Sequence, residues 1–227
     1  MIGVIGGSSL LEAQIFPDCK PKKVKTEYGD VEVFISKKMC FLQRHGKGIP
    51  PHKINHKANI SALKQMGVDR ILAVSSTGSM NRKLKPGDLV VIDDYMQMSG
   101  IPTFYDSTIR FTPPKIDEKL SQMLVMAAAD RGILVHKKGV YLQTQGPRFE
   151  TKAEIRMFSR FADVVGMTVA SEATLANEAG IPYACICSVD NYANGIGEDI
   201  GWEKIVAIQK KTIAIIKTIV LEAVRRI

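Results

Sequence analysis

Short apolar runs along the chain predict strands, several of them buried on both faces. The runs at residues 1–6, 71–74 and 183–188 are almost continuously apolar, which is typical of strands in the middle of a covered sheet. Val31–Ile35 and Met39–Leu42 are separated by three polar residues and predict a hairpin. Further strands are predicted at residues 88–92, 140–143 and 164–167.

Apolar residues three and four positions apart predict helices between these strands. One helical stretch follows Pro51 and ends near Gly67, and Thr151 and Glu154 have the spacing of a capping box that starts a helix at Lys152. Other helices are predicted at residues 116–131 and 170–179, and a C-terminal stripe comprises Ile205, Ile208, Ile215, Ile216 and Ile219. Strands that alternate with helices favour one α/β domain over residues 1–227, with a central mixed sheet flanked by helices.

An α/β sheet collects ligands where loops leave the carboxyl ends of its strands. Residues 99–114, with Pro102, Pro113 and Pro114, read as a long loop. The candidate ligand-binding loops follow residues 6, 42, 74, 144, 167 and 188.

Composition narrows the function classes. The 227 residues are 45% hydrophobic and 24% charged, and no apolar run approaches the roughly 18–20 residues that span a bilayer. The N-terminus lacks the basic region of a signal peptide, so we expect a cytoplasmic protein without a membrane partner. The net charge of +8 is scattered, with no RNA-recognition signature or basic arm; we therefore expect small anionic ligands and no nucleic acid.

The cysteines indicate neither a disulfide framework nor a metal site. Cys19 and Cys40 are isolated, and Cys185 and Cys187 are two apart in an apolar run, where they would share one face of a strand. We expect buried, reduced thiols and no bound metal.

Three segments at predicted strand ends suit a phosphate group. Gly6-Gly7-Ser8-Ser9 offers backbone N–H groups and hydroxyls, Arg44-His45 places a permanent cation beside an imidazole, and residues 75–79 are rich in hydroxyls. The first two have ordinary alternatives: a tight turn for Gly6-Gly7-Ser8-Ser9 and a surface ion pair for Arg44-His45. Three such segments on successive strands favour an anion site.

Two further segments carry aromatic, acid and amide groups. Phe149 and Glu150 precede a predicted helix, and Asp190 and Asn191 follow a predicted strand. Core packing of Phe149, a helix-dipole role for Glu150 and a turn-capping role for Asn191 are the alternatives.

In order, the motifs GVIGGSSL, QRHGKG, AVSSTGSMNRKLKPGDLVVIDDY, QTQGPRFETKAEIRMF and VVGMTVASEATLANEAGIPYACICSVDNYA resemble the trimeric purine nucleoside phosphorylase and methylthioadenosine phosphorylase family. The resemblance covers residues 1 to about 194. It departs from the family at Ser9, usually Gly, and at Ser171, usually Pro. It implies a nucleoside phosphorylase-like fold and a homo-oligomer, a trimer or hexamer.

The resemblance implies phosphorolysis, in which inorganic phosphate attacks C1′ of a purine nucleoside and releases the base. No cofactor is implied, because phosphate is a co-substrate. By analogy, Met167 lies under the ribose and Phe149 contacts the base. The residues implied to hold phosphate are Ser8, Arg44, His45, Ser75, Ser76 and Thr168.

Base preference follows from matching hydrogen-bond donors with acceptors. A 6-oxopurine presents N1–H as a donor, which suits the Glu150 carboxylate, and Asn191 can bond both N7 and O6 of such a base. Adenine-cleaving relatives carry Ser, Asp and Asp at the positions matching Glu150, Asn191 and Ala193. The residues here therefore favour 6-oxopurines, with Glu150 and Asn191 as catalytic candidates.

The 5′ substituent of the sugar is the remaining choice. Nucleoside-cleaving relatives bind the 5′-hydroxyl with a C-terminal His, but no His follows His136 here. Trp202 and Val206 would offer apolar contact to a methylthio group, which favours S-methyl-5′-thioinosine. The alternatives are an inosine or guanosine phosphorylase, a methylthioadenosine phosphorylase, and a nucleotide-binding module without catalysis.

Overall fold

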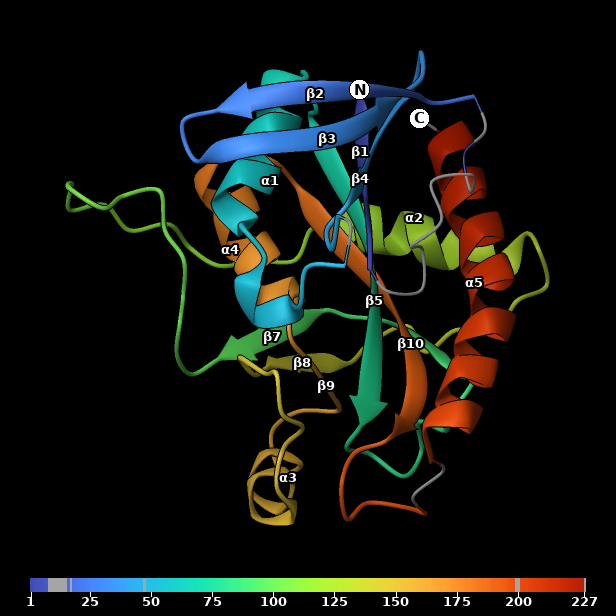
Figure 1. The fold of residues 1–227 in the computed structure, drawn as a ribbon. Helices are drawn as coiled ribbons and strands as arrows, with labels where there is room; N and C mark the ends of the chain where they lie inside the picture. The colour runs from blue at the N-terminus through green and yellow to red at the C-terminus, as the bar shows by residue number, and fades with distance from the viewer. Residues whose placement is uncertain (8–15, 17, 47, 199–200, 227) are drawn as a thin grey trace.

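The centre of the computed structural model is a twisted mixed sheet covered by helices on both faces (Figure 1). The structure describes residues 1–7, 16, 18–46, 48–198 and 201–226. Its strands are β1 (Ile2–Gly6), β2 (Lys20–Thr26), β3 (Gly29–Ile35), β4 (Met39–Gln43), β5 (Arg70–Ser79), β6 (Leu89–Val91), β7 (Asp94–Gln97), β8 (Val140–Gln143), β9 (Val164–Gly166) and β10 (Tyr183–Tyr192). Its α-helices are α1 (His56–Gln65), α2 (Glu118–Ala129), α3 (Lys152–Phe158), α4 (Val169–Glu178) and α5 (Gly201–Arg225).

Strand β5 joins the two halves of the sheet. It runs parallel to β1 and to β10, while β1 also runs parallel to β4. The last two residues of β5 pair antiparallel with β9, which continues into parallel β8 and β7. The sheet order is β2-β3-β4-β1-β5-β9-β8-β7, and β10 lies between β5 and β6. The predicted α/β class with a mixed sheet is confirmed.

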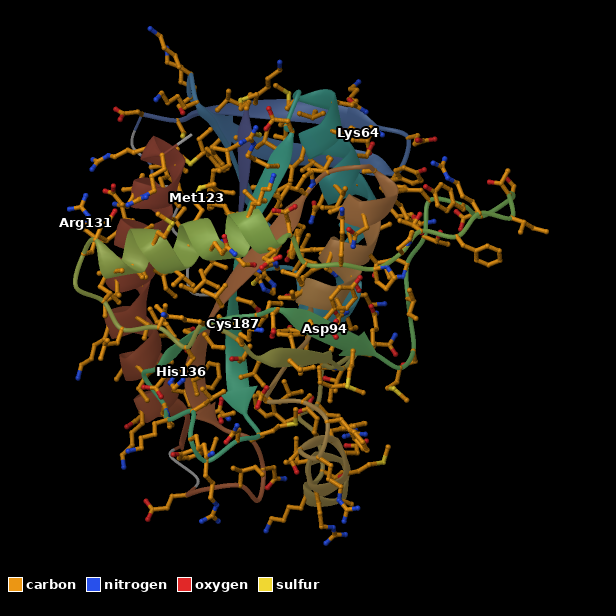
Figure 2. All side chains as sticks on the ribbon, turned by 180° about the vertical axis from the view of Figure 1, so that it is seen from behind. Lys64, Asp94, Met123, Arg131, His136 and Cys187 are labelled. Atoms are coloured by element: carbon orange, nitrogen blue, oxygen red, sulfur yellow. The ribbon has the colours of Figure 1, made fainter. Side chains whose placement is uncertain are left out.

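Alternate residues of the central strands face opposite helical layers. Ile71 and Ala73 of β5 pack with α1 and α4, and Leu72 and Val74 pack with α2 and α5. All four side chains are fully buried. This two-sided burial explains why the strand is continuously apolar rather than alternating. Figure 2 shows α2 crossing its face of the sheet, from Met123 to Arg131 near α5.

The four cysteines are free, and three of them are buried. Cys185 and Cys187 lie on one face of β10 with their sulfur atoms 3.8 Å apart, as the spacing predicts. Cys187 lies in the middle of the sheet in Figure 2. Burial raises the pKa of the Cys185 thiol well above its usual value, so the thiol stays protonated at neutral pH.

The structure corrects several predicted boundaries. Residues 75–79 and 189–192 were expected as loops, but they continue β5 and β10, which pair with each other from Tyr183 to Tyr192 with one irregularity near Val189. Small hydroxyl residues are compatible with a strand whose backbone groups are paired on both sides. Because of this irregularity, the side chains at the end of β10 do not alternate strictly between the two faces of the sheet.

Strands β2 and β7 were not predicted at all. In sequence, β2 looks like a cluster of basic residues, and Val24 is its one buried residue. Its backbone nevertheless pairs along the whole length of β3. An exposed edge strand rich in Lys resists pairing with other chains.

In α5, the buried face comprises Thr212, Ile216, Ile219, Val220, Ala223 and Val224, whereas Ile215 of the predicted stripe is exposed. None of the described helices is both long and apolar enough to cross a membrane.

Candidate active site

A cavity of about 800 Å³ opens at the carboxyl ends of β4, β5 and β10. Helix α5 forms one wall, and the segment before α3 forms another. Its lining brings together most of the candidate residues: Arg44, His45, Ser75, Ser76, Phe149, Glu150, Met167, Thr168, Asn191, Ala193 and Trp202. Ser8 lies outside the described residues.

Arg44 is held rigidly at the floor of the cavity. Its Nε and Nη2 donate to the two carboxylate oxygens of Glu172 at 2.6 and 2.9 Å, and its Nη1 donates to the Val74 carbonyl at 2.6 Å. The Tyr183 hydroxyl donates to the same carboxylate at 2.9 Å. Burial would lower the pKa of Arg44, but the Glu172 carboxylate holds it above its usual value. The side chain is therefore a fixed cation.

Gly7 allows the guanidinium to reach this position. A Cβ atom on Gly7 would collide with the Arg44 Nη1 atom and press on the Val74 carbonyl. Only glycine fits where β1 ends against the buried guanidinium. The N–H groups of Arg44 that Glu172 and Val74 do not use are available to an anion in the cavity.

His45 complements Arg44 with a neutral ring. Its Nδ1 lies 2.8 Å from the Ile49 carbonyl, which fixes a proton on Nδ1 and leaves Nε2 as an acceptor. Burial lowers the pKa of His45, so this neutral form is favoured at pH 7. A monoprotonated phosphate has one hydroxyl that can donate to such an acceptor.

Hydroxyl groups from β5 and α4 line the same end of the cavity. The Ser75 side chain is almost fully buried and Ser76 is half-buried, and both line the cavity. Thr168 is the residue before α4, and its side chain makes no capping hydrogen bond to that helix. A buried cation, an imidazole and hydroxyls together make a site for a small dianion.

Glu150 and Asn191, the acid and amide candidates, line the same cavity as Arg44 and His45. Glu150 is 7% exposed, and one of its carboxylate oxygens accepts from the Thr144 hydroxyl. The Asn191 Nδ2 donates to the Tyr192 carbonyl at 2.7 Å, which leaves its Oδ1 and a second N–H for a ligand. Their arrangement suits a heterocycle with both a donor and acceptors.

Met167 separates the main cavity from a smaller, more polar one. The smaller cavity has a volume of about 240 Å³, and Met167 and Pro51 line both. Phe149 lies at the main cavity with 66% of its surface exposed, whereas Ala193 is buried. Core packing therefore does not account for Phe149.

Helix α5 presents a different stripe to the cavity than the sequence predicts. Trp202, Ile205 and Gln209 line it, while Val206 does not. Positions 202, 205, 206 and 209 lie within one face of a helix, so the way α5 packs, and not helical periodicity, keeps Val206 out of the cavity lining. Trp202 is 66% exposed, so it does not pack in the core of the chain.

Two residues at the site escaped the sequence-based reasoning. Glu172 fixes Arg44 from α4, although in sequence it reads as one charge of a helix. Gln209 donates to Asp190 at 2.8 Å, and burial raises the pKa of that carboxyl. Asp190 itself was singled out in the sequence because it follows the apolar run of β10. In the part of the chain that the structure describes, no cluster of three His, Cys, Asp or Glu residues could hold a metal.

Comparison with known proteins identifies the class of enzyme. The phosphorylase superfamily model matches residues 1–225, and the chain belongs to this family. A methylthioadenosine phosphorylase from Schistosoma mansoni in complex with adenine superposes with a TM-score of 0.89 at 29% identity, covering 99% of this chain and 90% of that one. The fold expected from the resemblance is thereby confirmed.

The curated relatives point more narrowly to nucleosides. A probable 6-oxopurine nucleoside phosphorylase of Archaeoglobus fulgidus is 41% identical over all of this chain and 97% of its own length. A probable S-methyl-5′-thioinosine phosphorylase of Methanocaldococcus jannaschii is 41% identical over 88% of this chain and 82% of its own. An S-methyl-5′-thioadenosine phosphorylase of Hyperthermus butylicus is 37% identical over 100% and 88%.

Proposed function

We propose that the protein cleaves 6-oxopurine nucleosides with inorganic phosphate, without a further cofactor, and prefers S-methyl-5′-thioinosine. The products are hypoxanthine and 5-methylthioribose 1-phosphate. The observation that most directly supports this proposal is that Glu150 and Asn191 line the same cavity as the fixed Arg44 cation. The names of the relatives support a nucleoside substrate but differ on the base.

The proposed mechanism is a displacement at C1′. Phosphate bound by Arg44, His45 and the cavity hydroxyls approaches the anomeric carbon while the bond to purine N9 breaks, and positive charge develops on the ribose. The Asn191 side chain accepts a hydrogen bond from the protonated N7 and donates one to O6. The carboxylate of Glu150 accepts N1–H and so orients the base, while the Asn191 N–H at O6 stabilises the negative charge that develops on the departing base.

The proposed methylthio preference rests on the α5 wall. Trp202 and Ile205 offer apolar surface there, and an apolar pocket favours a methylthio group over a hydroxyl. Gln209 lines the same wall and favours the second candidate, inosine or guanosine, because its amide can bond a 5′-hydroxyl.

A substrate panel tests the proposal. We expect phosphate-dependent release of hypoxanthine from S-methyl-5′-thioinosine with a higher kcat/KM than from inosine, and little release of adenine from methylthioadenosine. A higher kcat/KM for inosine would favour the second candidate. Ligand binding with no base released from any of the three would contradict phosphorolysis and favour the non-catalytic module.

We also propose that the protein is a homo-oligomer, at least a trimer. Residues 99–114 project from the body of the molecule (light green in Figure 1). Ile109 and Phe111 of this arm are 94% and 91% exposed. Apolar side chains on a projecting arm favour contact with another copy.

A further inference from the structure

The start of helix α4 forms part of the cavity wall, and its first turn is capped in an unusual way. A Thr at the position before a helix ordinarily accepts an N–H of the first turn with its own hydroxyl. Thr168 occupies that position, but its side chain makes no such bond. No hydrogen bond joins its hydroxyl to any other described residue, and Thr168 lines the cavity.

Strand β8 supplies the acceptors instead. The Tyr141 hydroxyl accepts the backbone N–H of Thr168 at 3.2 Å and, more weakly, that of Val169 at 3.5 Å. The Gln143 Oε1 accepts the backbone N–H of Ser171 at 3.0 Å. Tyr141 and Gln143 are two residues apart, so they project from the same face of β8 toward the helix. Both are buried, at 0% and 8% exposure.

The surroundings of Tyr141 are shaped for this contact. A Cβ atom on Gly166 would collide with the Tyr141 hydroxyl, so a glycine there lets the phenol reach the helix start. Burial raises the pKa of Tyr141, so the phenol stays neutral, and its hydroxyl contacts the backbone at the start of α4.

We infer that Gln143 is a positioning residue that caps α4 in place of Thr168, while Tyr141 holds the Thr168 backbone, and that this leaves the Thr168 hydroxyl free to bind phosphate. The inference rests on the proposed function, in which phosphate occupies this end of the cavity. Without the Gln143 acceptor, the Thr168 hydroxyl turns toward the unpaired N–H of Ser171 and leaves the ligand.

A double-mutant cycle on Gln143 and Thr168 tests the inference. Gln143→Met removes the amide acceptor and keeps the length of the side chain, and Thr168→Val removes the hydroxyl and keeps the shape. Each single change is expected to raise the phosphate KM about 10-fold, the effect of one hydrogen bond to a charged ligand. The KM for the nucleoside should change less than about 2-fold, which a general loss of structure would not produce.

The decisive measurement is the coupling. In the Gln143→Met background, Thr168→Val should raise the phosphate KM by less than about 3-fold, because the Thr168 hydroxyl is already diverted. Equal effects of Thr168→Val in both backgrounds would overturn the inference. So would a Gln143→Met variant with unchanged phosphate KM, or with both KM values raised alike.

Tyr105→Phe is the control. The Tyr105 hydroxyl donates to the Glu178 carbonyl at 3.1 Å, so this substitution removes a hydrogen bond at the other end of α4, outside the cavity. It should leave the phosphate KM unchanged. If Gln143→Met does not fold, Gln143→Ala in the same cycle with Thr168→Val gives the answer by the same criterion.

Calorimetric titration with inorganic phosphate alone separates this inference from the proposed function. Coupling in the phosphate affinities with no nucleoside cleavage would sustain the inference and contradict the phosphorylase. Cleavage without coupling would sustain the phosphorylase and contradict the inference. A wild-type protein that does not bind phosphate would overturn both.

Discussion

At the residue scale, the buried pair of Arg44 and Glu172 defines the anion site. Both side chains are 1% exposed, and the carboxylate receives two N–H groups from Arg44 as well as the Tyr183 hydroxyl. A fully bonded buried ion pair contributes little net stability compared with apolar packing, but it holds a charge in one place. Its value here is that the cation cannot move away from the cavity.

Breaking this pair should cost both stability and phosphate affinity. Glu172→Gln leaves the buried guanidinium without a counter-charge, and we expect the free energy of unfolding to fall by about 3 kcal/mol. The phosphate KM should rise at least about 10-fold as the guanidinium shifts. Urea denaturation and steady-state kinetics measure the two effects. Asp106→Asn, which removes an exposed partner of Lys57, is the control and should cost less than about 1 kcal/mol.

Asn191 should determine which purine leaves. Asn191→Asp replaces the amide donor with an acceptor, which opposes O6 of a 6-oxopurine and matches the N6 amino group of adenine. The ratio of kcat/KM for S-methyl-5′-thioinosine to that for methylthioadenosine should fall at least about 10-fold. Glu150→Gln keeps an acceptor for N1–H and should slow the oxopurine reaction without that change in selectivity. If the Asn191→Asp variant keeps the same ratio of kcat/KM values, Asn191 does not determine which base is recognised.

At the scale of elements, the strongly patterned segments were predictable. The boundaries of β8 and the Thr151–Glu154 capping box follow from local sequence, and both are confirmed. The local sequence pattern did not predict those strands that form only because a distant strand pairs with them. The serines after Val74 look like a loop, but β10 pairs with them as far as Ser79, and the Lys-rich β2 is a strand only because β3 is its partner.

Only some of the residues that line or support the cavity could be picked out from the sequence. Arg44 and His45 stand out because a cation and an imidazole directly follow a buried strand. Glu172, on the other hand, is 128 positions from Arg44, and only the docking of α4 brings the two together. Gln209 replaces Val206 in the cavity wall because the rotation of α5 depends on packing far along that helix.

Helix α1 carries a pH dependence. His56 is its first residue, and burial lowers the pKa of the imidazole from 6.5 to about 4. The unfolded chain therefore binds the proton more readily, so stability contributed by the neutral ring is present above pH 6.5 and lost as the pH falls toward 4. The loss should be about 2 kcal/mol over this range.

Denaturation of wild type and His56→Gln between pH 4 and 7 tests this dependence. The variant should lose less stability than wild type as the pH falls. Parallel curves for the two proteins would show that His56 does not titrate as its burial predicts.

At the scale of the whole molecule, the projecting arm should control assembly. Phe111→Ser removes an exposed aromatic ring without touching the core. We expect wild type to elute in size-exclusion chromatography as a trimer or larger species, and the variant to dissociate at higher protein concentration. A monomeric wild type would contradict the proposed assembly, while Lys64→Ser, on the surface of α1, should behave as wild type.

The topology divides two recognition tasks between different parts of the chain. The guanidinium is locked into the core by β1, β5 and α4, whereas Glu150 and Asn191 are borne by the segment before α3 and by the tip of β10. Replacing a tip residue leaves the central packing intact, but relocating the cation would require rebuilding it. As sequences in this family diverge, we therefore expect the preference for the nucleobase to change often and the preference for the co-substrate to change rarely. Two relatives that are 41% and 37% identical to this chain are indeed named for different bases.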